Sequence, residues 1–291
     1  MSIDDLSKQV SSLLEGDFLK RLFAASIDNL KDRSNPLRIN NFSFSLRSVI
    51  DNILKASSPS EEIQLCSWFD PEIHTFKQSD KTVPNRESQL KYAIQFGVDD
   101  DFVMNDLNVD VSKHIKELKK AYERLNAYTH ITEKTFGTDE IKANSIIQNI
   151  LQSLHDFLSL IQSFKAELFK ALEEKVYNAV DFQAMYETLL PLDEIASHHS
   201  IEEIYLDNYK IKSIDSVFIR VESKGKISVV HQFGSNSDLK NDDGAEVDQE
   251  YPFDCNIAFY CSDPTDWDAE ESNFSVDTSK WWDGYYDETE L

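Results

Sequence analysis

A cation, a histidine and several hydroxyl or amide groups lie close together between residues 124 and 130. Arg124 and His130 are six positions apart in the stretch AYERLNAYTHITEKTF, residues 121–136. A histidine titrates near neutral pH and can transfer a proton, and the planar guanidinium of an arginine binds phosphate oxygens. A metal-independent ribonuclease needs both groups at the phosphodiester that it cleaves. We therefore take Arg124 and His130 as the candidate catalytic pair.

Three more polar side chains of this stretch, Asn126, Tyr128 and Thr129, are candidates for contacting RNA. The spacing of Arg124 and His130 fits the R-x4-6-H pattern of HEPN ribonucleases, helical and usually dimeric proteins that this chain resembles in its helical pattern. On an ideal helix, six positions leave two side chains roughly 120° apart. The pair therefore converges only if the helix unwinds after Tyr128 or if two protomers share the site. In the alternative interpretation, Tyr128 and His130 form a helix end, where the helix dipole favours His130.

Other side chains that bind metals or act as nucleophiles show no recognisable pattern. The histidines and cysteines lack the CxxC or HxxxH spacing of a zinc site. The acidic string DLKNDDGAEVDQE does not keep the alternating ligands of a calcium loop. No glycine-rich phosphate loop and no GxSxG sequence is present. We therefore predict that the protein uses no metal and no cofactor.

The charge of the chain is strongly acidic and unevenly distributed. The formal net charge is −24 over 291 residues. From Ser235 to the end, 17 Asp and Glu are offset only by Lys240 and Lys280, which leaves −9 for the first 234 residues. Such a surface repels nucleic acid, so RNA binding needs a local basic patch or a basic partner. The alternative to an enzyme is a non-enzymatic subunit of a complex, whose acidic C-terminal part binds a basic partner or mimics nucleic acid.

The sequence indicates a cytoplasmic protein that has no membrane segment. Charges interrupt its apolar runs, so none is long enough to span a bilayer. The start, MSIDDLSKQV, lacks the basic and apolar parts of a signal peptide. Cys66, Cys255 and Cys261 form no even set for disulfides, which fits a reducing cytoplasm.

Helices must position the candidate residues, because apolar side chains recur at helical spacing up to about residue 195. The pattern and its capping residues predict helices at 2–31, 45–56, 60–68, 86–96, 110–130 and 138–185, the last either continuous or with a hinge near 163–166. Ser2 and Asp110 are the expected N-caps, and the acidic run 99–101 favours another helix start. Residues 71–85 are expected to form a loop. Long apolar faces also pair helices across a dimer, so we expect a homo-oligomer formed through the helical part.

After His199 the pattern changes to alternating apolar and polar residues, which predicts antiparallel strands. The expected strands are EEIYLDNYKIKSI, then SVFIRVES and KISVVHQFG on either side of a turn at 223–226, and finally CNIAFYC. The acidic stretch before CNIAFYC is expected to form turns, and the chain after Asp263 to be largely irregular with its tryptophans as anchors. The predicted fold class is α+β, with a HEPN-like all-helical domain at 1–195 and a smaller antiparallel β-rich domain at 196–291.

Six phrases of the chain form a pattern together: NFSFSLRSVIDNIL, CSWF, RESQLKYAIQFGVDDDFV, LNAYTHITEKTF, FGSNSDLKNDDGAEVDQEYPFDC and DPTDW. They resemble a family of bacterial proteins, the predicted pPIWI-associating nucleases, which occur among antiviral defence genes. The resemblance implies a defence context with a protein partner, and it adds Arg86 to the YTH segment, Tyr128 to His130, as a substrate-binding candidate. The leading hypothesis is an antiviral, HEPN-like ribonuclease in which Arg124 stabilises the phosphate and His130 acts as general acid or base.

Overall fold

The computed structural model describes residues 2–78, 81–196 and 198–283. Its helices are α1 (Ile3–Leu13), α2 (Asp17–Asp28), α3 (Arg38–Ser57), α4 (Ser60–Ile63), α5 (Arg86–Gln95), α6 (Asp100–Asn105), α7 (Val111–Thr129), α8 (Glu140–Ala171), α9 (Glu173–Tyr186), α10 (Leu190–Asp193), α11 (Asn236–Lys240) and α12 (Ser279–Trp282). Its strands are β1 (Thr75–Gln78), β2 (Lys81–Pro84), β3 (His198–Ile214), β4 (Phe218–Phe233), β5 (Ala245–Tyr260) and β6 (Asp263–Val276).

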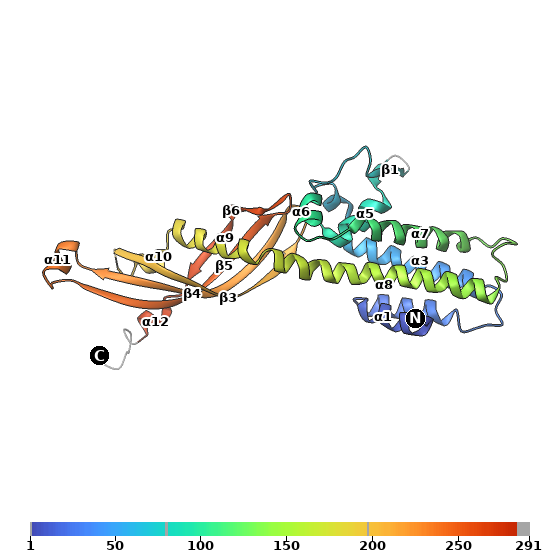
Figure 1. Ribbon diagram of the computed structural model, residues 1–291, viewed down its shortest axis with the longest axis horizontal. Coiled ribbons are helices and arrows are strands. Elements are labelled where there is room, and N and C mark those ends of the chain that lie inside the picture. Colours follow the sequence, from blue (N-terminus) through green and yellow to red (C-terminus); the bar gives the residue numbers. More distant parts are fainter. Residues whose placement is uncertain (1, 79–80, 197, 284–291) are drawn as a thin grey trace. The chain divides into compact units, whose positions relative to one another are not determined.

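The chain forms two compact units, Met1–Leu168 and Phe169–Leu291, so α9 and α10 belong with the sheet (Figure 1). The sequence predicts a domain boundary near residue 195, where the chain changes from helix to sheet. The position of this boundary between domains stays a prediction.

The first unit is a helical bundle in which α3 packs against α2, α5 and α7. Apolar residues recur every three or four positions along α3 and α7, and their burial removes apolar surface from water. Phe42, Leu46 and Ile50 of α3 are buried, as are Leu118 and Leu125 of α7. This core fixes the positions of the polar side chains at the edges of α3, α5 and α7.

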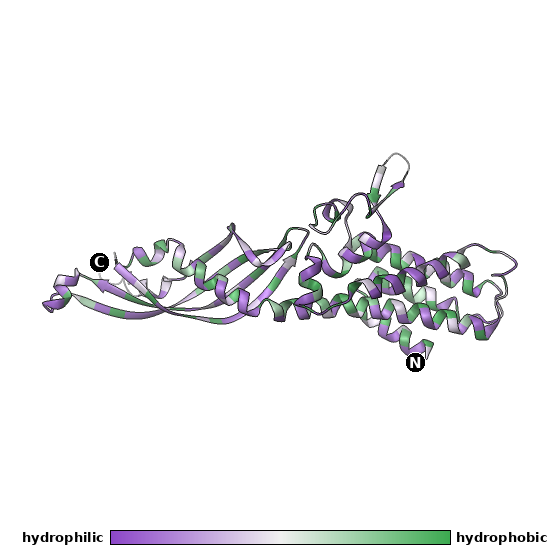
Figure 2. Ribbon diagram, turned by 45° about the horizontal axis from the view of Figure 1, so that its top comes forward, coloured by the Kyte–Doolittle hydropathy of each residue, from purple (hydrophilic) through white to green (hydrophobic). Residues whose placement is uncertain are grey.

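Hydrophobic and hydrophilic residues are interspersed along the long helices (Figure 2). Within the part of the chain that the structure describes, no helix combines the length and the apolar composition needed to cross a membrane. The amphipathic pattern instead separates a buried face from an exposed face, as in α7.

Polar side chains cap several helices where the sequence predicts them. Ser2 caps α1 and Asp110 caps α7, each by accepting a hydrogen bond from the backbone N–H three positions later. Asp99 caps α6, which confirms that the acidic run 99–101 starts a helix.

Three expectations for the first unit are wrong. Residues 2–31 do not form one helix, because Gly16, with φ of +82°, separates α1 from α2. The helix expected at 60–68 ends after one turn at Ile63, which packs into a buried cluster with aromatic residues. The expected loop at 71–85 contains the antiparallel hairpin of β1 and β2.

Two helices differ from their predicted limits. α3 begins at Arg38, well before the predicted start. The run predicted at 138–185 is neither continuous nor hinged at 163–166, because α8 continues through 163–166 and ends at Ala171, and α9 begins at Glu173. Phe164 and Leu168 are fully buried, so their packing stabilises the helical conformation at 163–166.

The second unit is an antiparallel sheet in the order β3-β4-β5-β6, and α9 packs against one of its faces (Figure 1). Residues of β4 alternate between the two faces, and Ile219, Val221, Ile227 and Val229 are buried. The helices of the first unit and this sheet confirm the α+β class.

The turn expected at 223–226 is wrong, because β4 runs through it without interruption. Gly225 marks close packing here. A Cβ atom at this position would come within 1.9 Å of the Tyr205 carbonyl oxygen and within 2.8 Å of the Phe253 ring. Only glycine lets the neighbouring strands approach β4 so closely.

Two segments that the sequence leaves irregular form strands. β5 begins at Ala245, within the acidic stretch, and β6 follows from Asp263. Pairing of β6 with β5 accompanies the burial of Phe274. Trp267 of β6 packs edge-on against Phe182 of α9, so it anchors this part of the chain as expected.

The cysteines Cys66, Cys255 and Cys261 are all buried. Burial raises the pKa of the Cys255 thiol to about 12. At neutral pH this thiol therefore stays protonated.

Candidate functional site

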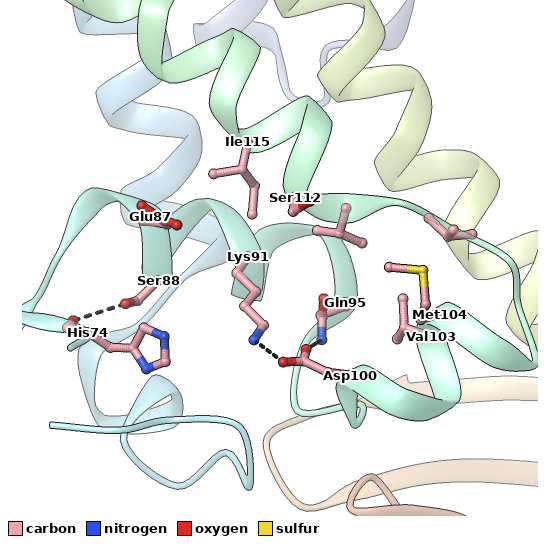
Figure 3. Close-up of a pocket in the computed structure, with 12 residues that line it drawn as sticks. His74, Glu87, Ser88, Lys91, Gln95, Asp100, Val103, Met104, Ser112 and Ile115 are labelled. Carbon is pink, nitrogen blue, oxygen red and sulfur yellow. Dashed lines mark hydrogen bonds and ion pairs between the residues drawn. The ribbon is translucent and has the colours of Figure 1, made fainter. Parts of the chain in front are cut away.

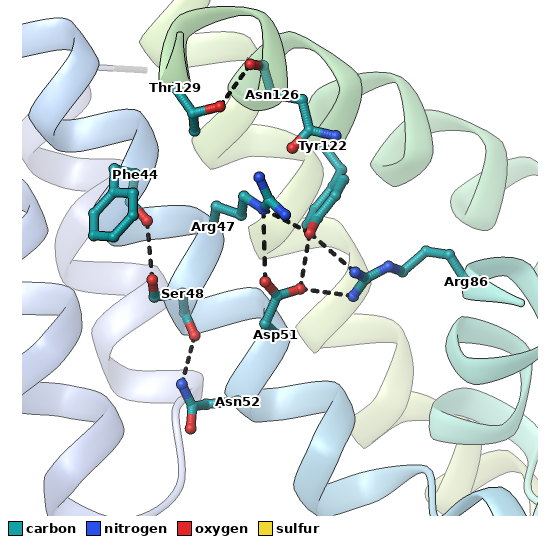
Figure 4. A network of polar contacts seen from close by, with 9 residues as sticks. All are labelled: Phe44, Arg47, Ser48, Asp51, Asn52, Arg86, Tyr122, Asn126 and Thr129. Carbon is teal, nitrogen blue, oxygen red and sulfur yellow. Dashed lines mark hydrogen bonds and ion pairs between the residues drawn. The ribbon is translucent and has the colours of Figure 1, made fainter. Parts of the chain in front are cut away.

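Four polar side chains join α3, α5 and α7 around the hydroxyl of Tyr122 (Figure 4). Arg47 donates from Nε to this hydroxyl at 2.9 Å, and Arg86 donates from Nη2 at 2.9 Å. The hydroxyl donates to Asp51 at 2.9 Å, and Nη1 of Arg86 lies 2.8 Å from the same carboxylate. We call Arg47, Asp51, Arg86 and Tyr122 the Tyr122 cluster.

Each helix supplies its part of the cluster at a defined place. Arg47 and Asp51 are four positions apart on one face of α3, and their side chains approach to 3.7 Å. Arg86 is the first residue of α5, whose start is fixed by Asn85 as the capping residue. Tyr122 belongs to the buried face of α7. The packing of the three helices therefore brings the four side chains together.

The cluster contains two cations and one carboxylate, so it carries one net positive charge while Tyr122 is protonated. Burial, followed by the hydrogen bond to Asp51, raises the pKa of Tyr122 above its ordinary value of 10. The Cζ atom of Arg86 also lies 4.3 Å from the centre of the Tyr122 ring, a cation–π contact. The side chains of Arg47 and Arg86 are 40% and 33% exposed, so an anion can reach them from solvent.

A pocket of about 330 Å³ opens beside the cluster, and Asp51, Lys55, Arg86 and Gln89 are among its lining residues. The hydroxyl of Ser58 donates to the Gln89 carbonyl at 2.7 Å and connects the end of α3 to α5. The cations Lys55 and Arg86 thus lie with the Asp51 carboxylate at the wall of an open pocket, and Arg47 lies behind that wall at the Tyr122 hydroxyl. This arrangement suits a phosphate group, which binds best to fixed donors that carry positive charge.

Three predicted substrate contacts lie further along α7. The Thr129 hydroxyl donates to the Asn126 carbonyl at 2.7 Å in the last turn of the helix (Figure 4). Among the described residues, the side-chain oxygen of Asn126 is buried without a hydrogen-bond partner. Tyr128 is only 7% exposed, and its carbonyl accepts a hydrogen bond from Asn40 at 2.8 Å. The Tyr128 ring lies in the core, and RNA contacts by these three residues stay a prediction.

The structure places Arg124 and His130 outside the Tyr122 cluster. Both are exposed, and Arg124 is two positions from Tyr122, which turns it roughly 200° around α7. α7 ends at Thr129, and His130 has an extended backbone with φ of −98° and ψ of 121°. The helix thus ends one residue later than the unwinding after Tyr128 that a convergence within one chain requires, and a site shared by two protomers stays the other alternative. Their pairing stays a prediction, and Arg86 is the one predicted site residue that belongs to the cluster.

Two models of one protein family match the chain, over residues 11–154 and over residues 161–282. Both describe a predicted pPIWI-associating nuclease. The chain belongs to the predicted pPIWI-associating nuclease family. Its membership supports a nuclease-like function, and the first matched region contains the whole Tyr122 cluster. The chain matches no curated protein and no solved structure.

Sequence reasoning misses three of the four cluster residues. Arg47 and Asp51 lie in the phrase NFSFSLRSVIDNIL, and their spacing of four on a helix is the signal that could have identified an ion pair. Tyr122 fits the apolar face of α7 and gives no separate signal. Arg86 was found only through the resemblance, and its contacts to α3 and α7 depend on packing between distant segments.

Proposed function

We propose that the protein is a nuclease in which Arg47 and Arg86 bind a phosphodiester of single-stranded RNA. The observation that carries this proposal is the convergence of two partly exposed guanidinium groups, from different helices, on one hydroxyl and one carboxylate. Guanidinium groups pair with phosphate oxygens, and fixed cations stabilise the charge that builds on phosphate during cleavage. The family supports the reaction class.

In this proposal the Asp51 carboxylate accepts the proton of the RNA 2′-hydroxyl. The oxygen then forms a bond to phosphorus while the bond to the 5′-oxygen breaks, and the leaving oxygen takes a proton from water. Arg47 and Arg86 stabilise the negative charge on the phosphate. The protonated Tyr122 hydroxyl holds the carboxylate and both guanidinium groups in position.

The HEPN-like hypothesis assigns the same reaction to other residues. There, Arg124 stabilises the phosphate, and His130 transfers the proton without a metal. The end of α7 at Thr129 supports this assignment, because it allows His130 to turn away from the helical path. Asn126, Tyr128 and Thr129 would then position the RNA.

Cleavage of a fluorescent single-stranded RNA by the purified protein tests the proposal. We expect Arg86→Ala to lower kcat/KM about 100-fold, as removal of one donor to a developing oxyanion does. Arg86→Lys should recover only part of the rate, because an ammonium group lacks the planar fork. Arg21→Ala is the matched control, since Arg21 is an exposed arginine in an ion pair on α2. Full activity of Arg86→Ala would overturn the proposal.

The variants Arg124→Ala and His130→Ala separate the two assignments. Loss of a general acid or base lowers a rate by about 100 to 10,000-fold. If these variants lose cleavage while Arg47→Ala and Arg86→Ala keep it, the HEPN-like pair is the catalytic one. Cleavage that continues in the presence of a chelator supports metal-independent chemistry. If the chelator abolishes cleavage and a divalent ion restores it, metal-independent chemistry is contradicted.

A non-enzymatic subunit is the second candidate function. The second unit, residues 169–291, contains 28 Asp and Glu and only 9 Lys and Arg, a formal charge of −19. A surface of this kind attracts a basic partner and repels RNA. Tight, salt-sensitive binding of a basic protein, together with no cleavage of RNA or DNA by the purified chain, would favour this function.

We further propose that the protein acts in antiviral defence in the cytoplasm, together with a protein partner, as a homo-oligomer formed through the first unit. The resemblance supports the defence context, and the long apolar helix faces support self-association. Light scattering of the purified protein measures the oligomer, and phage challenge of cells with and without the gene measures the defence.

A further inference from the structure

A second pocket, of about 250 Å³, lies beside α5 (Figure 3). Ser88, Lys91 and Gln95 line it, whereas Arg86 and Gln89 line the pocket beside the cluster. At 100° per residue these two sets point to opposite sides of the helix. The volume is below the roughly 300–1,000 Å³ of sites for drug-sized ligands, so the pocket suits one small ring system.

Charges in this pocket are balanced by partners. The Lys91 ammonium lies 2.7 Å from one oxygen of Asp100, and Gln95 donates to the other oxygen at 2.8 Å (Figure 3). Glu87 pairs with the Lys119 ammonium at 2.5 Å. The site therefore offers hydrogen-bond donors and acceptors without a large net charge. A neutral ligand that carries both kinds of group on its edge fits this chemistry.

A fixed ring and an apolar wall complete the pocket. Nδ1 of His74 accepts the backbone N–H of Asp70 at 2.8 Å, so a neutral His74 ring keeps its proton on Nε2 as a donor. The ring also stacks on Phe69, with centroids 5.8 Å apart. Val103 and Ile115 are among the apolar lining residues. Polar groups beside an apolar wall suit a flat heteroaromatic ring.

The pocket and the Tyr122 cluster lie along the same face of α7. Ile115 lines the pocket, and Tyr122 is seven positions later, which is about two turns and roughly 10 Å along the helix axis. Lys119 lies between them and pairs with Glu87 at the pocket. Because stacked nucleotides advance about 3.4 Å each along one strand, this distance corresponds to about three stacked nucleotides. The face of α7 itself is buried at Leu118, so one strand can reach both places only over the exposed edge formed by Glu87 and Lys119, whose side chains are 54% and 38% exposed.

We propose that this pocket receives one base of the single-stranded nucleic acid whose phosphate is bound by the Tyr122 cluster, an inference that rests on the proposed nuclease function. A base is flat and neutral, and its edge carries both donors and acceptors. The phosphate contacts give no sequence information, whereas contacts to a base edge do. The pocket thus selects the nucleotide a few positions from the cleaved bond.

Binding of a labelled 2′-O-methyl hexanucleotide, which lacks the attacking 2′-hydroxyl, tests the inference by fluorescence anisotropy. The comparison ligand is an abasic strand with the same number of phosphates. We expect the intact strand to bind about tenfold more tightly, the effect of one stacked base. In Ser112→Phe, whose ring fills the pocket from α7, the two affinities should become equal. Lys113→Phe is the matched control, since Lys113 is an exposed neighbour outside the lining.

The outcomes separate this inference from the function on which it rests. Equal binding of both strands by the unaltered protein, with weaker binding by Arg86→Ala, overturns the base pocket and leaves the phosphate site standing. No binding of either strand overturns the nuclease proposal and the base pocket with it. A preference for the intact strand that Ser112→Phe leaves unchanged places the base elsewhere and also overturns the inference.

Discussion

Tyr122 connects three helices through a single hydroxyl group. The hydroxyl accepts hydrogen bonds from Arg47 and Arg86 and donates one to Asp51. Because the pKa of Tyr122 is raised, chiefly by burial, the hydroxyl remains a donor at neutral pH. Removing this one atom should loosen both guanidinium groups without removing a charge.

We expect Tyr122→Phe to lower the free energy of unfolding by about 1 kcal/mol, since hydrogen bonds to charged groups are worth about 1.5–3 kcal/mol and the charged partners are partly solvated. Thermal unfolding followed by far-UV circular dichroism measures the loss. Tyr186→Phe, at a residue that is 75% exposed, is the control and should change stability by less than about 0.5 kcal/mol. The rate of RNA cleavage should decrease as well, because Arg47 and Arg86 lose the hydroxyl group that fixes their positions.

His231 is a second residue whose environment leads to a measurable effect. It is fully buried between strands of the sheet, and its Nε2 lies 2.9 Å from the Tyr251 hydroxyl. Burial, and then the nearby His199, lower the pKa of His231 below its ordinary value of 6.5. The unfolded chain therefore binds a proton at a higher pH than the folded chain does.

Because the pKa of His231 is lower in the folded chain, its contribution to the free energy of unfolding of the second unit should be constant above pH 6.5. This free energy should decrease as the pH falls below 6.5. Urea unfolding at pH 7.5 and 5.5, followed by tryptophan fluorescence, measures the difference. The His231→Asn variant should show a smaller decrease, and the exposed neighbour His198→Asn should behave like the unaltered protein. An equal decrease in all three proteins would contradict the assignment to His231.

At the scale of elements, the sequence predicts α7 and its Asp110 cap because the apolar spacing and the capping residue are local signals. It does not predict the path of β4, because a glycine marks a turn and a close approach of strands alike, and only the neighbouring Tyr205 and Phe253 decide between them. The Tyr122 cluster is hidden for a similar reason. Arg47 and Arg86 are far apart along the chain, and only packing brings them together.

Gly225→Ala should destabilise the sheet by about 1–3 kcal/mol, since the added methyl group overlaps the Tyr205 carbonyl and the Phe253 ring. The urea midpoint of the second unit measures this change. Lys226→Ala, at the next and exposed position of β4, is the control and should stay within about 0.5 kcal/mol. A normal midpoint for Gly225→Ala would show that the strands can separate at little cost.

For the whole molecule, the distribution of charge limits how nucleic acid can bind. The first unit, residues 1–168, has a formal charge of −5 and the second has −19. Long-range attraction of RNA is therefore absent, and binding depends on local cations such as Arg47 and Arg86. Few phosphates should be neutralised in the complex.

The dependence of RNA affinity on salt tests this view. For a single strand, each neutralised phosphate contributes a slope of about −0.7 to log K against log salt, so two guanidinium groups predict a slope near −1.4. We expect Arg86→Ala to reduce the slope by about 0.7, and Arg21→Ala to leave it unchanged. A slope several times steeper in the unaltered protein would indicate a larger basic surface than the cluster provides.

The burial of Cys66, Cys255 and Cys261 has a practical consequence for labelling. Buried thiols react slowly with maleimides, because the reactive thiolate is disfavoured and the reagent is excluded. A cysteine introduced at an exposed serine, such as Ser12 in the first unit and Ser262 in the second, would then be the preferred attachment point for a fluorophore. Energy transfer between two such dyes would follow the separation of the two units as RNA or a basic partner is added.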